Sequence, residues 1–178
     1  LKACRLLGAE INESETGWDI VKPIPVTTEE SRDDLLIDTG NSGTTLYLVT
    51  ALAAVLNRPV RFDGDDQIRK RSASNLLNAL SELGAEIESS PGGCAPYKVK
   101  GPLKGGSTSV ECPTSQYLSA LLMALPLLKN DAPSCIKVPL LMEKPYVEMT
   151  LRWMEERGVE LENRDFEEFI VPGNQSYK

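Results

Sequence analysis

The sequence predicts an α/β (α+β) domain made of repeated βαβαββ units, with parallel helices buried inside it. The first observation behind this prediction is a repeat, because three segments each read as a helix, a glycine and a strand. The second is that a strongly apolar helix lies in each interval between these segments. The glycines of the three segments are spaced 76 and 74 residues apart: Gly8, Gly84 and Gly158. Similar segments at one period indicate a duplicated structural unit.

The three similar segments are 2–11, 76–88 and 149–162. In each, apolar residues at helical spacing end in a glycine, which readily adopts the left-handed conformation found at helix C-termini. An alternation of apolar and acidic residues follows, which predicts a half-buried strand. Because Leu1 already falls within the first such helix, we expect the chain to start in mid-unit and to be a piece of a longer protein.

The two apolar helices are predicted at 44–56 and 115–128. Each is opened by small hydroxyl and amide residues that can cap it, and each ends at a turn containing Asn and Pro. A strand follows each turn, VRF in the first case and CIKV in the second. Both helices are apolar on nearly every face, so we expect them to be buried and to run parallel. The three glycine-terminated helices should be more exposed, with short four-stranded mixed sheets as outer walls.

The composition fits one compact domain and limits its functions. With 178 residues, 41% of them apolar, the chain can bury a core. The net charge of −7 argues against a nucleic-acid surface, and no apolar stretch reaches the roughly 18 residues of a membrane span. The four cysteines lack metal-ligand spacing and histidine is absent. We therefore expect no metal, no cofactor, and reduced thiols in the cytoplasm.

The openings of the two apolar helices are the candidate sites of chemistry. A helix N-terminus offers unpaired N–H groups and a positive dipole end to an anion. Residues 40–45 (GNSGTT) add glycines, hydroxyls and an amide, and 114–116 (TSQ) offers similar groups one repeat later. Equivalent helices of successive repeats should point their N-termini to one side and form one anion-binding surface. The alternative is that both openings are ordinary helix caps.

A basic cluster, 69–71 (RKR), lies just before the second glycine-terminated helix. Basic residues oppose the helix dipole there, so another interaction must favour them. An anionic ligand or an acidic neighbour would supply it, and plain solvation is the alternative.

Five motifs together resemble the family of enolpyruvylshikimate-phosphate (EPSP) synthase, or 3-phosphoshikimate 1-carboxyvinyltransferase. The resemblance implies the enolpyruvyl transferase fold, an inside-out α/β barrel-type domain. It further implies that 1–178 is most of the N-terminal domain of a two-domain protein, with about three repeat units, the first and last incomplete. We expect a monomer in which a C-terminal domain of the same protein is the partner. The motifs are GNSGTT (40–45), GPLKGG (101–106), TSQYLSALLMALPL (114–127), EKPYVEMTL (143–151) and VPGNQSYK (171–178).

The resemblance also implies a reaction, the transfer of the enolpyruvyl group of phosphoenolpyruvate to a hydroxyl of shikimate 3-phosphate, with release of phosphate. The family's catalytic carboxylates lie in the C-terminal domain, so this segment alone is expected to be inactive. The residues implied for phosphoenolpyruvate are Asn41, Gly43, Gln67 and Gln116. Those implied for shikimate 3-phosphate are Thr114, Ser115, Gln116, Glu143 and Tyr146.

Three residues depart from the family pattern. Tyr47 and Gln67 stand where the family has arginines, and Glu143 stands where it has a serine that helps to bind the shikimate phosphate. Glutamine cannot replace the charged, bidentate fork of an arginine, and a carboxylate beside a phosphate is repulsive. Arg69 could swing in for the missing guanidinium. Otherwise the chain is a divergent homologue with another acceptor, or a non-catalytic binding domain.

Two related classes compete with this interpretation. UDP-N-acetylglucosamine enolpyruvyl transferase shares the fold and carries a reactive cysteine in a GGC loop. This chain has GGC at 92–94, but after a predicted strand, in a hairpin-like turn, where the sister enzyme's loop precedes a helix. An RNA-terminal-phosphate cyclase-like protein uses related units, but the acidic charge and the missing histidine count against it.

Overall fold

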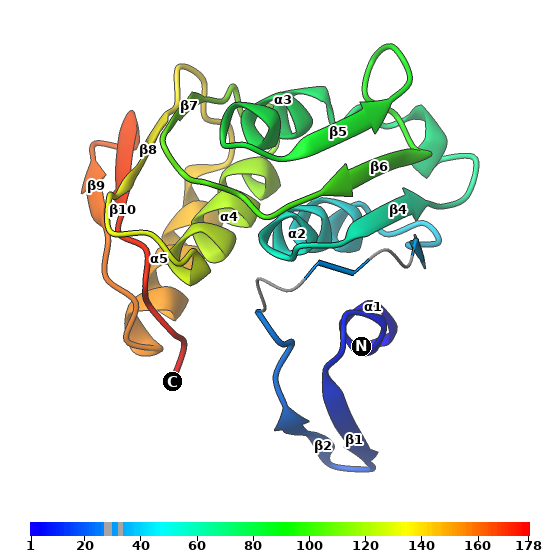
Figure 1. Cartoon of the computed structure of the whole chain (residues 1–178). Coiled ribbons are helices and arrows are strands. Elements are labelled where there is room, and N and C mark those ends of the chain that lie inside the picture. The colour runs from blue at the N-terminus through cyan, green and yellow to red at the C-terminus, as the bar shows by residue number, and fades with distance from the viewer. Residues whose placement is uncertain (27–29, 32–33) are drawn as a thin grey trace.

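The computed structural model describes residues 1–26, 30–31 and 34–178. Within them two units follow one another, each with the order β-α-β-α-β-β (Figure 1). The first unit comprises β3 (Leu35–Asp38), α2 (Gly43–Val55), β4 (Pro59–Asp63), α3 (Ser74–Glu82), β5 (Glu86–Ser89) and β6 (Tyr97–Lys100). The second comprises β7 (Ser107–Ser109), α4 (Ser115–Ala124), β8 (Ser134–Lys137), α5 (Lys144–Glu156), β9 (Glu162–Arg164) and β10 (Glu168–Val171).

The two units build the same sheet. The strand orders are β3-β4-β6-β5 and β7-β8-β10-β9, so each position in one sheet has its equivalent in the other. In both, the first two strands pair in parallel and the remaining pairs are antiparallel. This confirms the repeated βαβαββ unit and the four-stranded mixed sheets.

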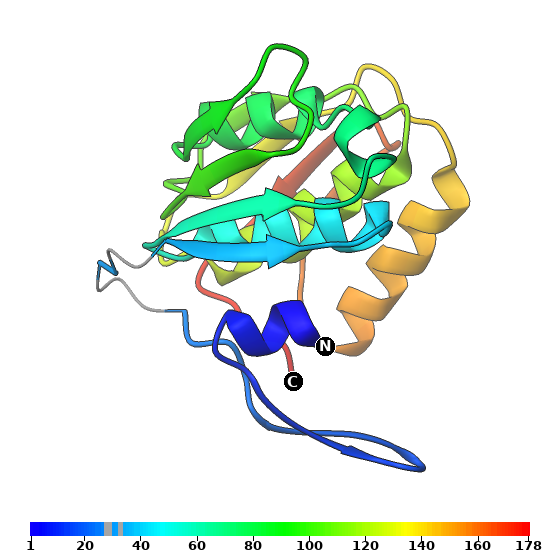
Figure 2. The ribbon, with the colours of Figure 1, turned by 90° about the vertical axis from the view of Figure 1, so that its right-hand side faces the viewer.

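A half unit precedes the two full ones. It consists of α1 (Lys2–Leu6) and the antiparallel hairpin of β1 (Glu10–Ser14) and β2 (Gly17–Lys22), which matches the α-β-β half of the later units. The hairpin extends away from the body of the molecule (Figure 2) and is almost wholly exposed. The prediction that the last unit is incomplete was wrong, because the segment after Gly158 folds back as both β9 and β10.

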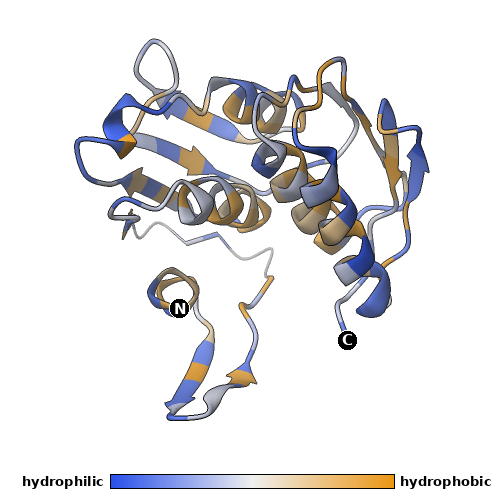
Figure 3. Cartoon of the chain, turned by 180° about the vertical axis from the view of Figure 1, so that it is seen from behind, coloured by the Kyte–Doolittle hydropathy of each residue, from blue (hydrophilic) through white to orange (hydrophobic). Residues whose placement is uncertain are grey.

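The apolar helices α2 and α4 are largely buried, and the later turns of α2 carry mostly apolar colouring (Figure 3). Their first turns line one cleft, through Thr44 and Gln116, and their later turns line the next, through Leu52 and Ala124. The two helices therefore run parallel, as predicted. The helix expected at 115–128 ends sooner, since Pro126 has no N–H to donate and the chain continues as the 3₁₀ helix η2 (Leu125–Leu127).

The glycine of each repeated segment ends its helix as predicted. Gly8, Gly84 and Gly158 have φ of +105°, +106° and +75°, which glycine adopts without the steric cost of a Cβ. The strands that follow were expected to be half-buried, but β1, β5 and β9 are mostly exposed. The reason is their place in the fold, because β5 and β9 are edge strands and β1 belongs to the projecting hairpin. As expected, α5 is far more exposed than α2 or α4.

Candidate functional site

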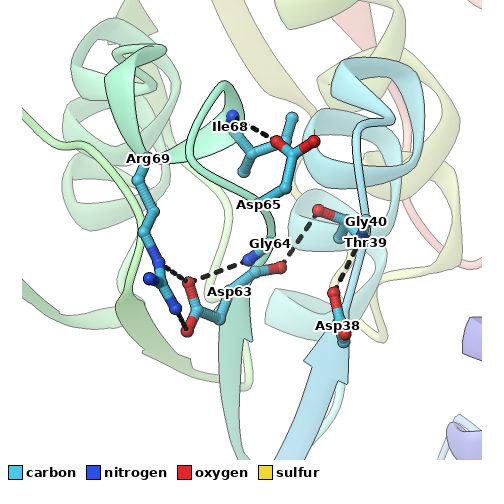
Figure 4. Close-up of polar contacts among 8 residues, drawn as sticks. All are labelled: Asp38, Thr39, Gly40, Asp63, Gly64, Asp65, Ile68 and Arg69. Carbon is cyan, nitrogen blue, oxygen red and sulfur yellow. Dashed lines mark hydrogen bonds and ion pairs between the residues drawn. The ribbon is translucent and has the colours of Figure 1, made fainter.

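The ends of two parallel strands position the opening of α2. At the carboxyl ends of β3 and β4, the N–H of Thr39 donates to the carbonyl of Asp63 at 2.9 Å, and the N–H of Asp65 donates to the carbonyl of Gly40 at 2.9 Å. The Thr39 hydroxyl also donates to the Asp63 carbonyl, at 3.1 Å (Figure 4). Gly64 allows this close approach, since a Cβ there would lie 2.6 Å from the Gly40 carbonyl oxygen. The two loops are thus fixed against each other.

The first turn of α2 is capped within its own motif. Ser42 Oγ accepts from the N–H of Thr45 at 3.1 Å and donates to Thr45 Oγ1 at 2.8 Å. This is the capping role that small hydroxyl residues commonly take. Asn41 is exposed in front of the helix, Gly43 is buried, and Thr44 faces the neighbouring cleft.

Arg71 is the guanidinium at this opening. A Cβ built on Gly43 would lie 2.8 Å from Arg71 Nη1, so the arginine occupies the space that the glycine leaves open. The turn that carries Arg71 is held in place through the next residue, Ser72. The carbonyl of Ser72 accepts from Tyr117 Oη at 2.6 Å and from Tyr47 Oη at 3.4 Å. Burial raises the pKa of Tyr117, so its hydroxyl stays protonated as a donor at neutral pH.

Arg69 is engaged elsewhere. Its Nε and Nη2 donate to the two carboxylate oxygens of Asp63 at 2.9 and 2.8 Å (Figure 4). Hydrogen bonding from Arg69 holds the pKa of Asp63 below its usual value. The expectation that Arg69 swings in for the missing guanidinium is therefore not met in this structure. The basic cluster is divided, with Arg69 on an acidic neighbour and Arg71 at the helix opening.

The opening of α4 has the same kind of cap and one additional group. Thr114 Oγ1 accepts from the N–H of Gln116 at 3.4 Å. Glu143, from the start of α5, places Oε2 3.2 Å from Ser115 Oγ and 3.3 Å from Ser115 N. Gln116 Oε1 is buried and has no hydrogen-bond partner among the described residues. A buried amide oxygen without a donor indicates room for a ligand or water.

These elements meet at a cleft of about 370 Å³. Among its lining residues are Thr44 of α2, Ser115 and Gln116 of α4, and Glu143 and Tyr146 at the start of α5. Predicted residues from two distant motifs are thus brought to one place. Along the described ranges 1–26, 30–31 and 34–178, no cluster of His, Cys, Asp and Glu suited to a metal ion occurs.

Other predicted residues lie beside the cleft or away from it. Asn41 and Gly43 are at the α2 opening and Thr114 is the N-cap of α4, although none of the three lines the cleft. Gln67 is exposed in the turn before the 3₁₀ helix η1 (Ile68–Lys70), where its N–H donates to Asp65 Oδ1. Tyr47, which stands where an arginine was expected, is buried against Tyr117.

Sequence reasoning did not assign Arg71 to the site. Thr44 was included there only as part of the GNSGTT motif (40–45), at the first turn of the helix. Arg71 belongs to the noted basic cluster, but no local signal distinguishes it from Arg69. The GGC residues lie in the β5–β6 hairpin loop, as predicted, and the backbone of Cys94 bridges to Ser72.

The fold and the cleft define a domain of repeated βαβαββ units in which the first turns of two buried, parallel helices meet at one cleft. The chain belongs to the family of EPSP synthase (3-phosphoshikimate 1-carboxyvinyltransferase), whose model matches residues 1–178. This membership does not favour the sister-enzyme or cyclase interpretations. Among the described residues, no helix is long and apolar enough to cross a membrane.

Two curated relatives named 3-phosphoshikimate 1-carboxyvinyltransferase are similar over the whole chain. The protein from Acetivibrio thermocellus is 41% identical over 179 residues, which cover 100% of this chain and 41% of the relative. The protein from Methanococcoides burtonii is 42% identical over 182 residues, or 100% of this chain and 42% of the relative. The chain therefore spans about two fifths of their length.

A solved structure, EPSP synthase from Acinetobacter baumannii, superposes with a TM-score of 0.76 over 99% of this chain and 38% of that one. The sequence identity is 19%, so this likeness shows the fold. The enolpyruvyl transferase fold predicted from the motifs is thereby confirmed.

Proposed function

We propose that this chain is the substrate-binding part of an enzyme that transfers the enolpyruvyl group of phosphoenolpyruvate to a hydroxyl of shikimate 3-phosphate, releasing phosphate. The single observation that carries the proposal is the convergence of the α2 and α4 openings, from motifs more than 60 residues apart, on one cleft. Family membership and the names of the relatives support the choice of reaction.

The two openings divide the ligands between them. The α2 opening, with Asn41, Gly43 and the guanidinium of Arg71, suits the phosphate and carboxylate of phosphoenolpyruvate, because fixed N–H groups and a delocalised cation favour a compact anion. Gln116, in the first turn of α4, lines the cleft, and its amide oxygen has no partner among the described residues, which fits contact with both ligands. Gln67 stays a prediction, since it lies in an exposed turn.

The α4 opening suits shikimate 3-phosphate. The hydroxyls of Thr114 and Ser115 and the N–H groups of the first turn offer donors to a phosphate, and Tyr146, 59% exposed, offers a ring at the rim of the cleft. Glu143 lines the same cleft and is therefore placed beside the same ligand.

The chemistry itself requires more than this chain supplies. The reaction protonates the enol carbon while the hydroxyl attacks, through a tetrahedral intermediate, so it needs an acid, a base and exclusion of water. We propose that a second domain of a longer, monomeric protein closes over the cleft and brings the catalytic carboxylates. The segment 1–178 alone would then have no activity. All four cysteines are free thiols, which supports a reducing, cytoplasmic setting.

The proposal is tested by phosphate release from the full-length protein with both substrates. Release that requires phosphoenolpyruvate and shikimate 3-phosphate together is expected, and no release would leave a non-catalytic binding domain. Replacing Thr114 and Ser115 together by alanine should raise the KM for shikimate 3-phosphate at least tenfold. Hydrogen bonds to a charged group are worth about 1.5–3 kcal/mol each. An unchanged KM would assign that ligand elsewhere.

A further inference from the structure

The opening of α4 already holds an anion, which belongs to the chain itself. Glu143 Oε2 accepts from both the hydroxyl and the backbone N–H of Ser115, at 3.2 and 3.3 Å. The residues are 28 positions apart, so this contact is tertiary. A carboxylate at a helix N-terminus is favoured by the dipole and by the free N–H groups, which are the features that attract a phosphate.

The backbone of Glu143 shows that this placement is specific. Glu143 is the N-cap of α5, yet its carboxylate caps no described group of that helix. By contrast, Ser42 and Thr114 cap the helices that they begin. Glu143 also has φ 62° and ψ 44°, a left-handed conformation that costs energy for a residue with a Cβ. Its contact with α4 offsets part of that cost.

No ion pair balances the charge of Glu143 within the described ranges, because none of their salt bridges involves it. Its sequence neighbour Lys144 instead lies with Nζ 5.5 Å from the centre of the Phe166 ring. A phosphate could therefore not share the α4 opening with this carboxylate without strong repulsion.

We propose that Glu143 is an internal competitor at the α4 opening and thereby sets its specificity. In the free protein its carboxylate takes the donors of Ser115, and an anionic ligand binds there by displacing it. A tethered group competes at a high effective concentration, so the ligand must carry more charge than a carboxylate. The site thus selects a phosphate dianion over singly charged or neutral analogues. The identity of that ligand rests on the proposed function, whereas the competition does not.

The test measures the Kd of inorganic phosphate by calorimetry in the full-length protein and its variants. Glu143→Ser and Glu143→Gln should each lower that Kd at least tenfold. The effect of Glu143→Ser should be the larger one, because the amide oxygen of the glutamine can still accept from Ser115. Glu148→Gln is the matched control, because Glu148 lies on α5 and lines a different cleft. It should leave the Kd within twofold of wild type.

A second comparison isolates the contact. In a Ser115→Ala background, Glu143→Gln should lower the Kd less than it does in wild type, because the carboxylate has already lost its hydroxyl donor and keeps only the backbone N–H of residue 115. An unchanged or weaker phosphate affinity in both Glu143 variants, with circular dichroism showing a native fold, would overturn the inference. An equal gain from Glu148→Gln would also overturn it, by reducing the effect to net charge. Failure of phosphate release in the turnover assay counts against the proposed function instead, since the calorimetry uses phosphate alone.

Discussion

Tyr47 of α2 and Tyr117 of α4 pack edge to face, with ring centroids 4.9 Å apart and ring planes at 90°. Both hydroxyls point to the carbonyl of Ser72, which directly follows Arg71. Aromatic pairs of this geometry stabilise a contact beyond the area that they bury. The pair thus joins the two buried helices near their openings and anchors the turn that brings Arg71 to Gly43.

The first prediction concerns this pair. Tyr117→Phe should lower the free energy of unfolding by about 1 kcal/mol, because it removes a short, largely buried hydrogen bond. Tyr47→Phe should cost less than about 0.5 kcal/mol, since its 3.4 Å contact is long and weak. Urea unfolding of the two variants against wild type provides the measurement. An equal or larger cost for Tyr47→Phe would show that the shared carbonyl is not the anchor.

The second prediction separates two glycines of the GNSGTT motif. Gly43→Ala should change the free energy of unfolding by less than about 1 kcal/mol, because alanine suits a helix and the displaced group is the flexible end of Arg71. It should nevertheless raise the KM for phosphoenolpyruvate several-fold by moving the guanidinium.

Gly40→Ala is its control. At Gly40, φ is +57° and the added Cβ meets nothing within 4 Å, so this variant should lose about 1–2 kcal/mol of stability to backbone strain. Urea unfolding and the KM for phosphoenolpyruvate are measured for both. A KM that Gly43→Ala leaves unchanged would contradict the assigned place of Arg71.

The third prediction compares the two arginines. Arg71→Gln should raise the KM for phosphoenolpyruvate at least tenfold in the full-length protein, because a permanently charged donor fork is replaced by a neutral amide. Arg69→Gln should leave that KM within about threefold of wild type, since Arg69 is bound to Asp63. Steady-state kinetics at saturating shikimate 3-phosphate distinguish the two. Reversed effects would return the ligand contact to Arg69.

The fourth prediction is a pH dependence. Hydrogen bonding from Arg69 lowers the pKa of Asp63 from its ordinary 3.8 in the folded state. The carboxylate therefore contributes stability that is fully present above about pH 4 and is lost as the pH falls through the lower, folded value. Asp63→Asn should be less stable than wild type at pH 7, and the difference should shrink as the pH falls below 3.8 and through the lowered pKa of Asp63. Urea unfolding at a series of falling pH values measures it, and a difference that does not shrink with falling pH would exclude this carboxylate as its source.

Much of the fold could be predicted because its signals are local. The glycines that end α1, α3 and α5 follow from their left-handed conformation, and the caps of α2 and α4 follow from small hydroxyl residues before apolar runs. The apolar faces of α2 and α4 indicated that they are buried. The boundaries of some elements differed, where Pro126 interrupts a helix and where β9 begins later than its apolar–acidic pattern indicated. The exposure of β1, β5 and β9 and the completeness of the last unit also differed from the prediction.

Part of the candidate site was equally predictable, since Ser115, Gln116, Glu143 and Tyr146 share one cleft. Tyr47 stands where the family has an arginine, so the sequence alone suggested that a charged group of the site is missing. In the structure this side chain is 6% exposed and packs in the core against Tyr117. Residue identity alone could not show which way the side chain lies.

The sequence by itself determined the repeat, the types of its elements and the two helix openings, because periodicity, capping and glycine conformation act over a few residues. Only the tertiary structure decided that Arg71 lies at Gly43 while Arg69 pairs with Asp63, and that Glu143 occupies the donors of Ser115. The 28-residue separation between Glu143 and Ser115 is closed by the packing of α5 against α4. The charge pattern of the site therefore depends on how whole elements pack, which no short stretch of sequence encodes.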